Sequence, residues 1–314
     1  MDLLIVGTPG PLLAWIGEVA RTAAALASPA LTLTGDNTDG SLAETARPAL
    51  LVSDLVDPKQ EAAVLNGTLR AIVVIDDAAT CLAAQRSKGQ GLVASFRNLT
   101  ICATPLGRLA GCANAHIVMR NDADPAALIR HIFHTGGWAV EGNALATVTR
   151  QFAATCPPLV PAAAGDAALL EQVVQPAFRF AATGMRGEVT WPRAVMLWGD
   201  HPDQPAPRVL NLTGPAQVLC YGPYFRLPPG HWTARVKLAF SPGCKDAPLA
   251  LEMHGEARHD RCRFRVPRAG LFEAMFRFAI TSPHEAIEIR LVSERGAIEG
   301  ALGIEHAVLT PVTL

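Results

Sequence analysis

The sequence lacks long hydrophobic runs and any excess of charge of one sign. The apolar run at residues 3–6 is short and follows Asp2, where a signal peptide would carry basic residues. No later segment has the about 18 uncharged apolar residues that a membrane helix needs. The 27 Lys and Arg nearly balance the 28 Asp and Glu, which argues against a general affinity for nucleic acid or anionic membranes. We expect a soluble, cytoplasmic protein that binds no nucleic acid and has no membrane span.

Cysteine and metal motifs are also missing. The seven cysteines are scattered and never form C-x-x-C, which predicts buried thiols and neither a disulfide framework nor a zinc site. His131 and His134 share a face of an expected helix, but no third ligand accompanies them. Because no nucleophile or acid–base pair stands out either, we expect no catalytic residues, no metal and no cofactor.

Residues 1–150 alternate between strand and helix patterns. Asp77 and Asp124 are expected helix N-caps, with Pro125 at the first helical position. Alternating elements predict a doubly wound, mostly parallel sheet whose ligands would sit at the carboxyl ends of the strands. The expected strands are residues 3–6, 49–54, 71–76, 99–103 and 115–120, and the expected helices are residues 12–26, 59–69, 78–88 and 125–134.

The loop after the first strand is the place where such a fold would hold a phosphate, through backbone N–H groups and the positive end of the following helix. A Walker A loop needs G-x-x-x-x-G-K-[ST], but here the last three positions read Leu-Leu-Ala, and Pro11 removes a donor. The loop is therefore degenerate. The candidate cofactor-binding residues are Gly7, Thr8 and Gly10.

Two motifs in this half resemble the sulfotransferase family. Gly-Thr-Pro at residues 7–9, followed by Ala-Trp-Ile at residues 14–16, looks like the family's opening G-T-P-R-S-G-T-T-W-L, which binds the 5′-phosphosulfate end of the donor. The Arg-Ser-Gly-Thr-Thr core is absent. Residues 71–82 are similar to the family's second motif, a strand ending in R-D-P, but Asp76 replaces the arginine, Ala78 replaces the proline, and Cys81 lies near the family's serine.

A third stretch, residues 115–125, is similar to the family's late strand and Asp-Pro helix. The resemblance covers about the first 140 residues and implies a P-loop-like scaffold without its donor-binding residues. An acid at position 76 would repel the 3′-phosphate that the family's arginine holds. The alternative is a generic doubly wound α/β domain with a Gly-Pro-rich first loop.

Residues 151–188 read as a linker and a helix. Residues 156–165 are rich in Pro, Ala and Gly, and residues 166–182 form a helix pattern that Pro176 would interrupt. A strand at residues 189–198 would enter the last domain. The predicted domains are residues 1–150, 151–188 and 189–314.

The C-terminal part predicts an antiparallel, jelly-roll-like β-sandwich. Gly222-Pro223 and residues 228–230 are expected turns. The patterns at residues 227–236, 286–291 and 302–309 are similar to galactose-binding-like and carbohydrate-binding β-sandwich modules. The expected strands are residues 209–212, 217–220, 232–240, 249–254, 261–266, 271–280, 285–293 and 304–310.

This second resemblance implies sugar binding by aromatic faces that stack on a pyranose and by polar groups that fix its hydroxyls. Trp191, Trp198 and His254 are further candidates. For each aromatic residue the alternative is a place in the sandwich core. Tyr224 is the strongest exception, because it flanks a Gly-Pro pair. The candidate glycan-binding residues are Tyr221, Tyr224, Arg226, His231, Trp232, Glu252 and Arg290.

Together these patterns favour a non-catalytic glycan-binding or assembly protein, whose partners would be a glycan or the machinery of polysaccharide synthesis. A bacterial setting is our hypothesis from the Ala-rich, Lys-poor composition. One alternative is a sulfotransferase-like or nucleotide-sugar-dependent transferase whose first loop binds phosphate through backbone donors alone. Another is a structural homo-oligomer.

Overall fold

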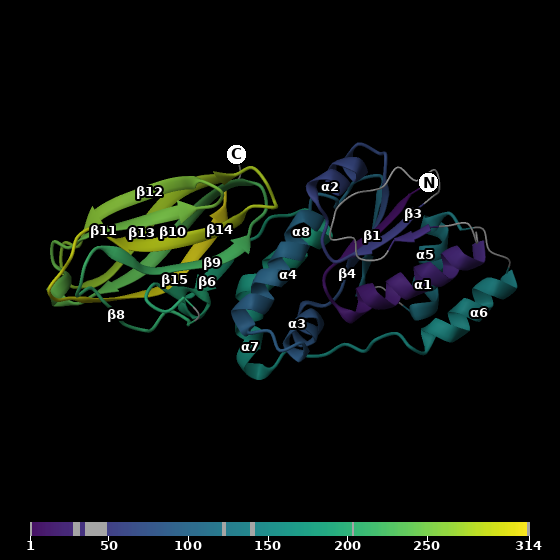
Figure 1. Cartoon of the computed structure of the whole chain (residues 1–314), viewed down its shortest axis with the longest axis horizontal. Coiled ribbons are helices and arrows are strands. Elements are labelled where there is room, and N and C mark those ends of the chain that lie inside the picture. Colours follow the sequence, from purple (N-terminus) through teal and green to yellow (C-terminus); the bar gives the residue numbers. More distant parts are fainter. Residues whose placement is uncertain are drawn as a thin grey trace. The chain divides into compact units, whose positions relative to one another are not determined.

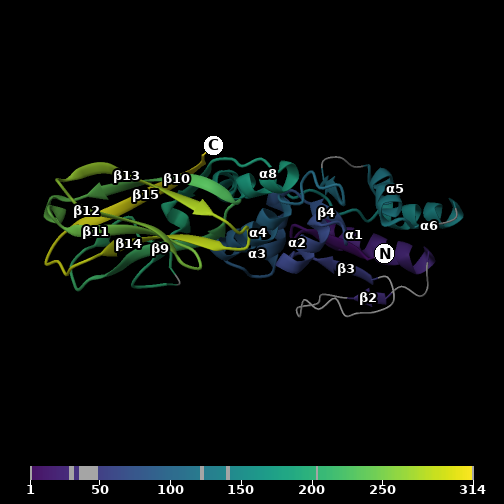
Figure 2. The ribbon, with the colours of Figure 1, turned by 90° about the horizontal axis from the view of Figure 1, so that it is seen from above.

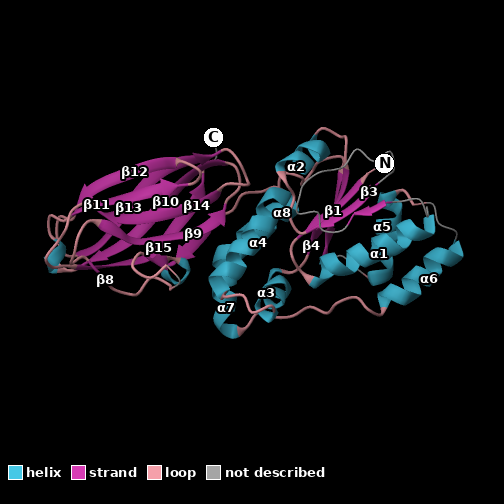
Figure 3. Cartoon of the chain, in the orientation of Figure 1, coloured by secondary structure: helices cyan, strands magenta, loops and turns pink. Residues whose placement is uncertain are grey.

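The computed structural model describes residues 2–27, 32–34, 49–120, 124–138, 142–202 and 204–312 (Figure 1). The chain divides into two compact units, Met1–Ala167 with Phe178–Met185 and Ala168–Ala177 with Arg186–Leu314. Figure 3 shows that a helix-rich part with one sheet is followed by a part built almost wholly of strands. The predicted order, α/β and then β-sandwich, is confirmed. Among the described helices, none has the length and apolar character to cross a membrane.

The first unit is built on a five-stranded parallel sheet, here called sheet A, with the order β2-β3-β1-β4-β5. β1 and β4 are apolar and buried along nearly their whole length. Strands of this kind are typical of a parallel sheet that helices cover on both faces. The strands are β1 (Leu3–Gly7), β2 (Thr32–Thr34), β3 (Ala49–Ser53), β4 (Arg70–Ile75) and β5 (Ala115–Met119).

Helices lie on both faces of sheet A. Leu3 and Ile5 of β1 belong to a buried cluster with residues of α1, α5 and the following helix. α4 contacts β1 as well, and the alternate residues Leu4 and Val6 point to the other face of the sheet. The helices are α1 (Pro11–Ala27), α2 (Pro58–Leu65), α3 (Ala78–Ser87), α4 (Leu92–Leu106), α5 (Pro125–Gly136) and α6 (Gly142–Ala153).

The predicted helix caps are confirmed. The Asp77 carboxylate accepts the N–H of Thr80 at 2.9 Å, and Asp124 caps α5 with Pro125 at its first position. Gly137 follows α5 with φ of 68°, a left-handed conformation that suits glycine.

The strand predicted at residues 99–103 is wrong, because these residues lie inside α4. Phe96, Leu99, Ala103 and Leu106 are all buried, and their spacing of three and four marks one face of a helix. The run Leu-Thr-Ile-Cys-Ala looks strand-like alone, since the helical period shows only over a longer window. α6 was not predicted either.

The helix predicted at residues 166–182 is interrupted ahead of Pro176, as expected. It consists of α7 (Ala164–Leu169), a π-helical turn η2 (Leu170–Val174) and α8 (Gln175–Thr183). Pro176 has no N–H to donate and its ring crowds the carbonyl group four residues earlier. The π turn lies directly ahead of this proline.

The second unit is an antiparallel sandwich of two five-stranded sheets, which Figure 2 shows as layers. Sheet B has the order β13-β10-β15-β6, with β8 beside β15. Sheet C has the order β12-β11-β14-β9-β7. The strands are β6 (Val189–Pro192), β7 (Leu197–Trp198), β8 (Leu210–Asn211), β9 (Gln217–Arg226), β10 (Gly230–Phe240), β11 (Pro248–His254), β12 (Arg258–Arg265), β13 (Gly270–Ile280), β14 (Ala286–Ser293) and β15 (Ala301–Pro311). Two 3-10 turns are η3 (Arg193–Val195) and η4 (Pro242–Cys244).

Two local predictions in this unit are corrected. The strand expected at residues 189–198 is two strands, β6 in sheet B and β7 in sheet C, joined by η3 directly after Pro192. The turn expected at Gly222-Pro223 lies inside β9, where the register against β14 shifts. Tyr224 follows with φ of 66°. An extra residue in one strand forms a bulge that re-aims a side chain, so the Gly-Pro signal marks a bulge and not a chain reversal.

Candidate functional site

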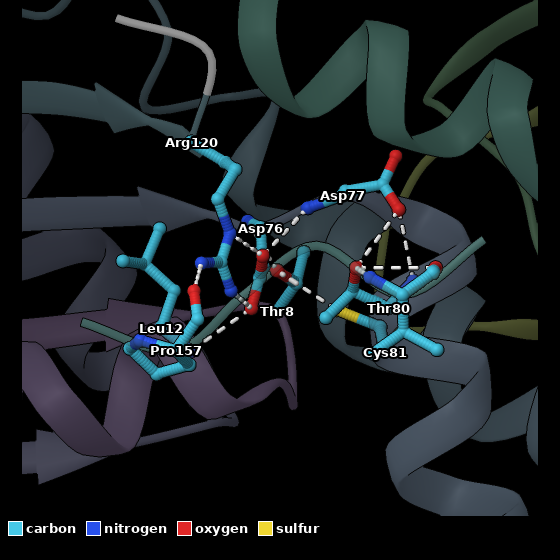
Figure 4. A network of polar contacts seen from close by, with 9 residues as sticks. Thr8, Leu12, Asp76, Asp77, Thr80, Cys81, Arg120 and Pro157 are labelled. Atoms are coloured by element: carbon cyan, nitrogen blue, oxygen red, sulfur yellow. Dashed lines mark hydrogen bonds and ion pairs between the residues drawn. The ribbon is translucent and has the colours of Figure 1, made fainter. Parts of the chain in front are cut away.

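The first candidate site lies at the carboxyl edge of sheet A. Asp76 follows β4 and Arg120 follows β5; because Ile75 is the register partner of Met119, the next residues lie side by side. Nε of Arg120 is 2.6 Å from Oδ1 of Asp76, and Nη2 is 3.0 Å from Oδ2 (Figure 4). The Asp76 side chain is 0% exposed and that of Arg120 is 7% exposed. This is a buried, bidentate ion pair.

The Asp76 carboxylate also accepts hydrogen bonds from the backbone. The N–H of Leu12, in the first turn of α1, donates to Oδ2 at 2.9 Å, and the N–H of Asp77 donates to Oδ1 at 2.8 Å. The N–H of Asp76 itself donates to the hydroxyl oxygen of Thr8 at 2.9 Å. A helix N-terminus attracts anions through its free N–H groups and its dipole. Here the chain supplies that anion itself.

The loop around this carboxylate is closely packed. A Cβ at Gly10 would lie 2.5 Å from Oδ2 of Asp76 and 2.7 Å from Sγ of Cys81. Burial raises the pKa of the Cys81 thiol well above its ordinary value, and the charge of Asp76 adds to this effect. The thiol therefore stays protonated and is a poor nucleophile.

The segment after α6 crosses the same edge of the sheet. Arg120 donates through Nη1 to the carbonyl oxygen of Pro157, and the N–H of Val160 donates to Oγ1 of Thr80 at 2.9 Å. The guanidinium group is thus engaged on two sides, by a carboxylate and by a backbone carbonyl.

This geometry does not fit a phosphate or phosphosulfate group in the first loop. Gly10 lies against the Asp76 carboxylate, which already accepts the N–H of Leu12 at the end of this loop, so a second anion there would meet like charge at short range. The prediction that Gly7, Thr8 and Gly10 bind a phosphate finds no support in the contacts.

A groove of about 760 Å³ lies beside the loop, between the first turns of α1 and the carboxyl end of β3. Trp15 and Phe152 line it together with two basic residues, Arg21 and Lys88. Arg21 forms an ion pair with Glu18 one turn earlier. The groove is large enough for a small organic ligand.

The histidines of α5 do not build a metal site. His131 lies near His116 of β5, with ring centroids 6.1 Å apart. Burial lowers the pKa of His131, and neighbouring His116 and His134 lower it further. Over the part of the chain that the structure describes, no three His, Cys, Asp or Glu side chains are grouped so that they could hold a metal ion.

The second candidate site is the outer face of sheet C. Tyr221 and Tyr224 of β9 lie there with ring centroids 5.9 Å apart and an interplanar angle of 76°. Both side chains are partly exposed. Positive φ is uncommon for a residue other than glycine and costs about 1–3 kcal/mol, so Tyr224 is held against its own backbone preference.

Two charged residues of β14 flank the tyrosine pair. Arg290 is the register partner of Tyr221, and its Nε donates to Oε1 of the buried Glu288 at 2.6 Å. Burial and, to a smaller extent, a hydrogen bond to Glu288 raise the pKa of Tyr224 to about 12. Glu288 therefore ties the hydroxyl of Tyr224 to the guanidinium group of Arg290.

A ladder of alternating charge continues from the tyrosines across the sheet. In the strand register, Tyr221 lies opposite Arg290, Arg290 lies opposite Glu252, and Glu252 lies opposite Arg261. His254 contacts Oε2 of Glu252 through Nε2 at 2.8 Å. Burial would raise the pKa of Glu252, but this hydrogen bond and the charge of Arg261 outweigh it and lower the pKa. The face thus offers aromatic rings, hydrogen-bond acceptors and guanidinium groups within one surface.

Sheet C brings together most of the predicted glycan-binding residues: Tyr221, Tyr224, Arg226, Glu252 and Arg290. His231 lies on β10 of sheet B and is exposed there, so it is not part of this face. Trp232 is a correction: it is fully buried, and its indole N–H donates to the carbonyl oxygen of Pro228 at 3.0 Å. A ring in the core cannot stack on a sugar. Trp191 is fully buried as well.

Two residues of these sites, Arg120 and Glu288, were not predicted from the sequence. Arg120 and Asp76 stand at the ends of two predicted strands. Their opposite charges were a signal for an ion pair. Glu288 stands in the run Ile-Glu-Ile-Arg, where alternation places it beside Arg290 on one face. Glu288 is buried, and this burial left no local signal in the sequence.

No protein-family model matches the sequence, and the search of curated proteins returned no match. Solved structures similar to this chain include a sulfotransferase and carbohydrate-binding modules. Over 48% of its length the chain is similar to mouse sulfotransferase SULT7A1 complexed with PAP, with 12% identity and a TM-score of 0.40. The match spans 63% of that sulfotransferase, less than two thirds of it.

Two carbohydrate-binding modules are also similar to this chain. The CBM36-1 domain of a multidomain xylanase from the hindgut metagenome of Trinervitermes trinervoides matches 41% of this chain over 100% of its own length, with 9% identity and a TM-score of 0.28. The C-terminal CBM6 of LamC from Zobellia galactanivorans matches 39% of this chain over 98% of its own length, with 11% identity and a TM-score of 0.26. The two-part resemblance noted in the sequence is present in these matches. At such identities and TM-scores they carry no argument about what this chain binds.

Proposed function

We propose that this chain is a non-catalytic glycan-binding protein, in which the outer face of sheet C holds the sugar and the α/β unit is a scaffold. Its use in assembling polysaccharide-synthesis machinery in a bacterium belongs to the same hypothesis. The observation that carries the proposal is the tyrosine pair, held on an exposed face beside Glu288 and Arg290.

The pair has the features that sugar recognition needs. A pyranose has apolar faces that stack on aromatic rings and hydroxyl groups that need donors and acceptors. Tyr221 supplies a ring, and Arg290 and Glu252 supply a donor and an acceptor on neighbouring strands. The positive φ of Tyr224 supports a functional reading, since strained backbone often marks a binding position.

The filled anion position in the α/β unit supports the non-catalytic part of the proposal. A donor bound by its phosphate would have to displace Asp76 from Arg120 and from the N–H of Leu12. Separating a buried ion pair costs about 3–5 kcal/mol, which would weaken donor binding by more than a hundredfold.

The test is calorimetric binding of the full chain to a panel of neutral and acidic oligosaccharides. Tyr221→Ala should weaken binding about tenfold or more, because a stacked ring contributes on the order of 1 kcal/mol beyond its buried area. His231→Ala, on the outer face of sheet B, is the matched control and should leave affinity unchanged. Loss of binding in the control but not in the tyrosine variant would refute the proposed face.

A transferase that uses a nucleotide or nucleotide-sugar donor is the second candidate, and the groove beside residues 9–11 is the observation that favours it. A thermal-shift screen with adenosine 3′,5′-bisphosphate, common nucleotides and nucleotide-sugars tests it. Ligand at about 100 times its dissociation constant adds roughly 2.7 kcal/mol of stability. A shift that Lys88→Gln abolishes would favour the transferase, and the absence of any shift would favour the scaffold.

A further inference from the structure

The outer face of sheet C is rich in arginine, although the whole chain has a formal net charge of −1. The strand registers place Glu252 and Glu288 on the same face, and Glu294 follows β14. The arginines on this face, by alternation and register along β9, β12 and β14, are Arg226, Arg258, Arg261, Arg263, Arg265 and Arg290.

The carboxylates of this face neutralise only part of that charge. Glu294 is shared by two arginines, with Oε1 at 2.5 Å from Arg261 and 2.8 Å from Arg263. Arg258 approaches Glu252 only to 3.8 Å. Arg265 donates to a backbone carbonyl, that of Asp246, at 3.0 Å.

The positive charge on β12 is also accessible to a ligand. The side chain of Arg258 is 51% exposed and that of Arg263 is 66% exposed. Guanidinium groups in water bind carboxylates through two parallel hydrogen bonds when the anion is presented to them. An anionic ligand could therefore gain contacts at β12 that a neutral one could not.

We propose that the ligand of this face is an acidic glycan with uronate carboxylates, which runs across the strands from the tyrosine pair on β9 to the arginines of β12. This inference rests on the proposed function and names its substrate class. Neighbouring strands lie about 4.8 Å apart, so an extended chain crossing β9, β14, β11 and β12 meets a new side chain at each step.

The glutamates in the ladder argue for a glycan and against a nucleic acid. Glu288 and Glu252 lie between the tyrosines and the arginines of β12. Nucleic acids carry one charge at every phosphate, so a strand crossing this face would bring phosphates close to both carboxylates. A uronate chain has hydroxyl groups beside each of its carboxylates, and these hydroxyl groups can donate to the glutamates.

The experiment compares two probes with the same backbone, an oligogalacturonate of defined length and its methyl ester, titrated into the full chain. The acidic form should bind about tenfold more tightly, because two or three exposed ion pairs each contribute up to about fivefold. The difference should shrink as salt rises from about 50 to 500 mM. Equal affinity for ester and acid would overturn the acidic class while leaving glycan binding intact, whereas no binding of any oligosaccharide would overturn the proposed function itself.

Charge variants locate the contact. Arg263→Glu should remove most of the preference for the acid, and the milder Arg263→Gln should remove part of it without disturbing folding. Arg235→Glu on the outer face of sheet B is the matched control and should change nothing. A single-stranded oligodeoxynucleotide of equal charge is the third probe; if it binds more tightly than the oligogalacturonate, the face serves nucleic acid and the inference is wrong.

Discussion

Asp76 and Arg120 close the carboxyl edge of the parallel sheet by pairing with each other, and the same Asp76 carboxylate accepts the first free N–H of α1 from Leu12. In a fold where this place normally serves a ligand, an internal anion has become part of the protein's own structure. The ion pair and this hydrogen bond therefore hold the edge of the sheet together.

Removing either partner of the ion pair should strongly destabilise the fold. Asp76→Asn and Arg120→Gln should each lower the free energy of unfolding by about 3–5 kcal/mol, because the remaining charge stays buried without its partner. The double variant should lose clearly less than the sum of the two. Urea unfolding measures all three. The exposed pair of Lys237 and Glu305 is the control, and its neutralisation should have no measurable effect. If the losses of unfolding free energy in the two single variants added up in the double variant, Asp76 and Arg120 would not be acting as an ion pair.

The position vacated by Asp76 should accept an external anion. In Asp76→Ala, the guanidinium group of Arg120 and the N–H of Leu12 lose their acceptor, and inorganic sulfate should take its place. We expect sulfate to raise the melting temperature of Asp76→Ala more than that of the unmodified chain, with chloride at equal ionic strength as reference. Asp76→Ala combined with Arg120→Ala should show only the general salt effect. If sulfate raised the melting temperature of all variants equally, Arg120 and the N–H of Leu12 would not form an anion site without Asp76.

Much of this architecture can be read from local patterns. The strands that end at Asp76 and Arg120 were predicted, since buried apolar runs bounded by polar residues show their ends. That these two strands are neighbours was not predicted, because the order β2-β3-β1-β4-β5 depends on contacts between distant parts of the chain. The same applies to Glu252, whose position between Arg290 and Arg261 depends on which strands become neighbours.

Other features were hidden by ambiguous signals. Gly222-Pro223 reads as a turn, and only pairing with β14 on one side and β7 on the other shows that the chain continues through it as a bulged strand. Trp232 and Tyr221 both stand in alternating stretches, so composition alone did not tell the buried ring from the exposed one. That distinction follows from which face of each sheet meets the other sheet.

The Glu252 contacts should make the sandwich sensitive to acid. The pKa of Glu252 is lowered, so its contacts stabilise the folded state above the ordinary value of 4.5 and this stabilisation is lost as the pH falls through the folded-state pKa. We expect the difference in unfolding free energy between the unmodified chain and Glu252→Gln to be largest near pH 7 and to disappear at strongly acidic pH. A difference that does not change with pH would show that Glu252 acts through packing and not through its charge.

The tyrosines on the outer face of sheet C can be followed by absorbance, because Tyr221 and Tyr224 are the only two tyrosines of the chain. Burial and a hydrogen bond to Glu288 raise the pKa of Tyr224 to about 12, so the tyrosinate absorbance of this residue should rise near pH 12. The raised pKa means that the neutral phenol stabilises the folded state below the ordinary pKa of about 10 and that this contribution is lost as the pH rises toward 12. Tyr224→Phe should remove this rise, and Glu288→Gln should move it to lower pH. If the rise near pH 12 survives in Tyr224→Phe, Glu288 does not hold the Tyr224 hydroxyl, and the geometry of the proposed glycan-binding face is wrong.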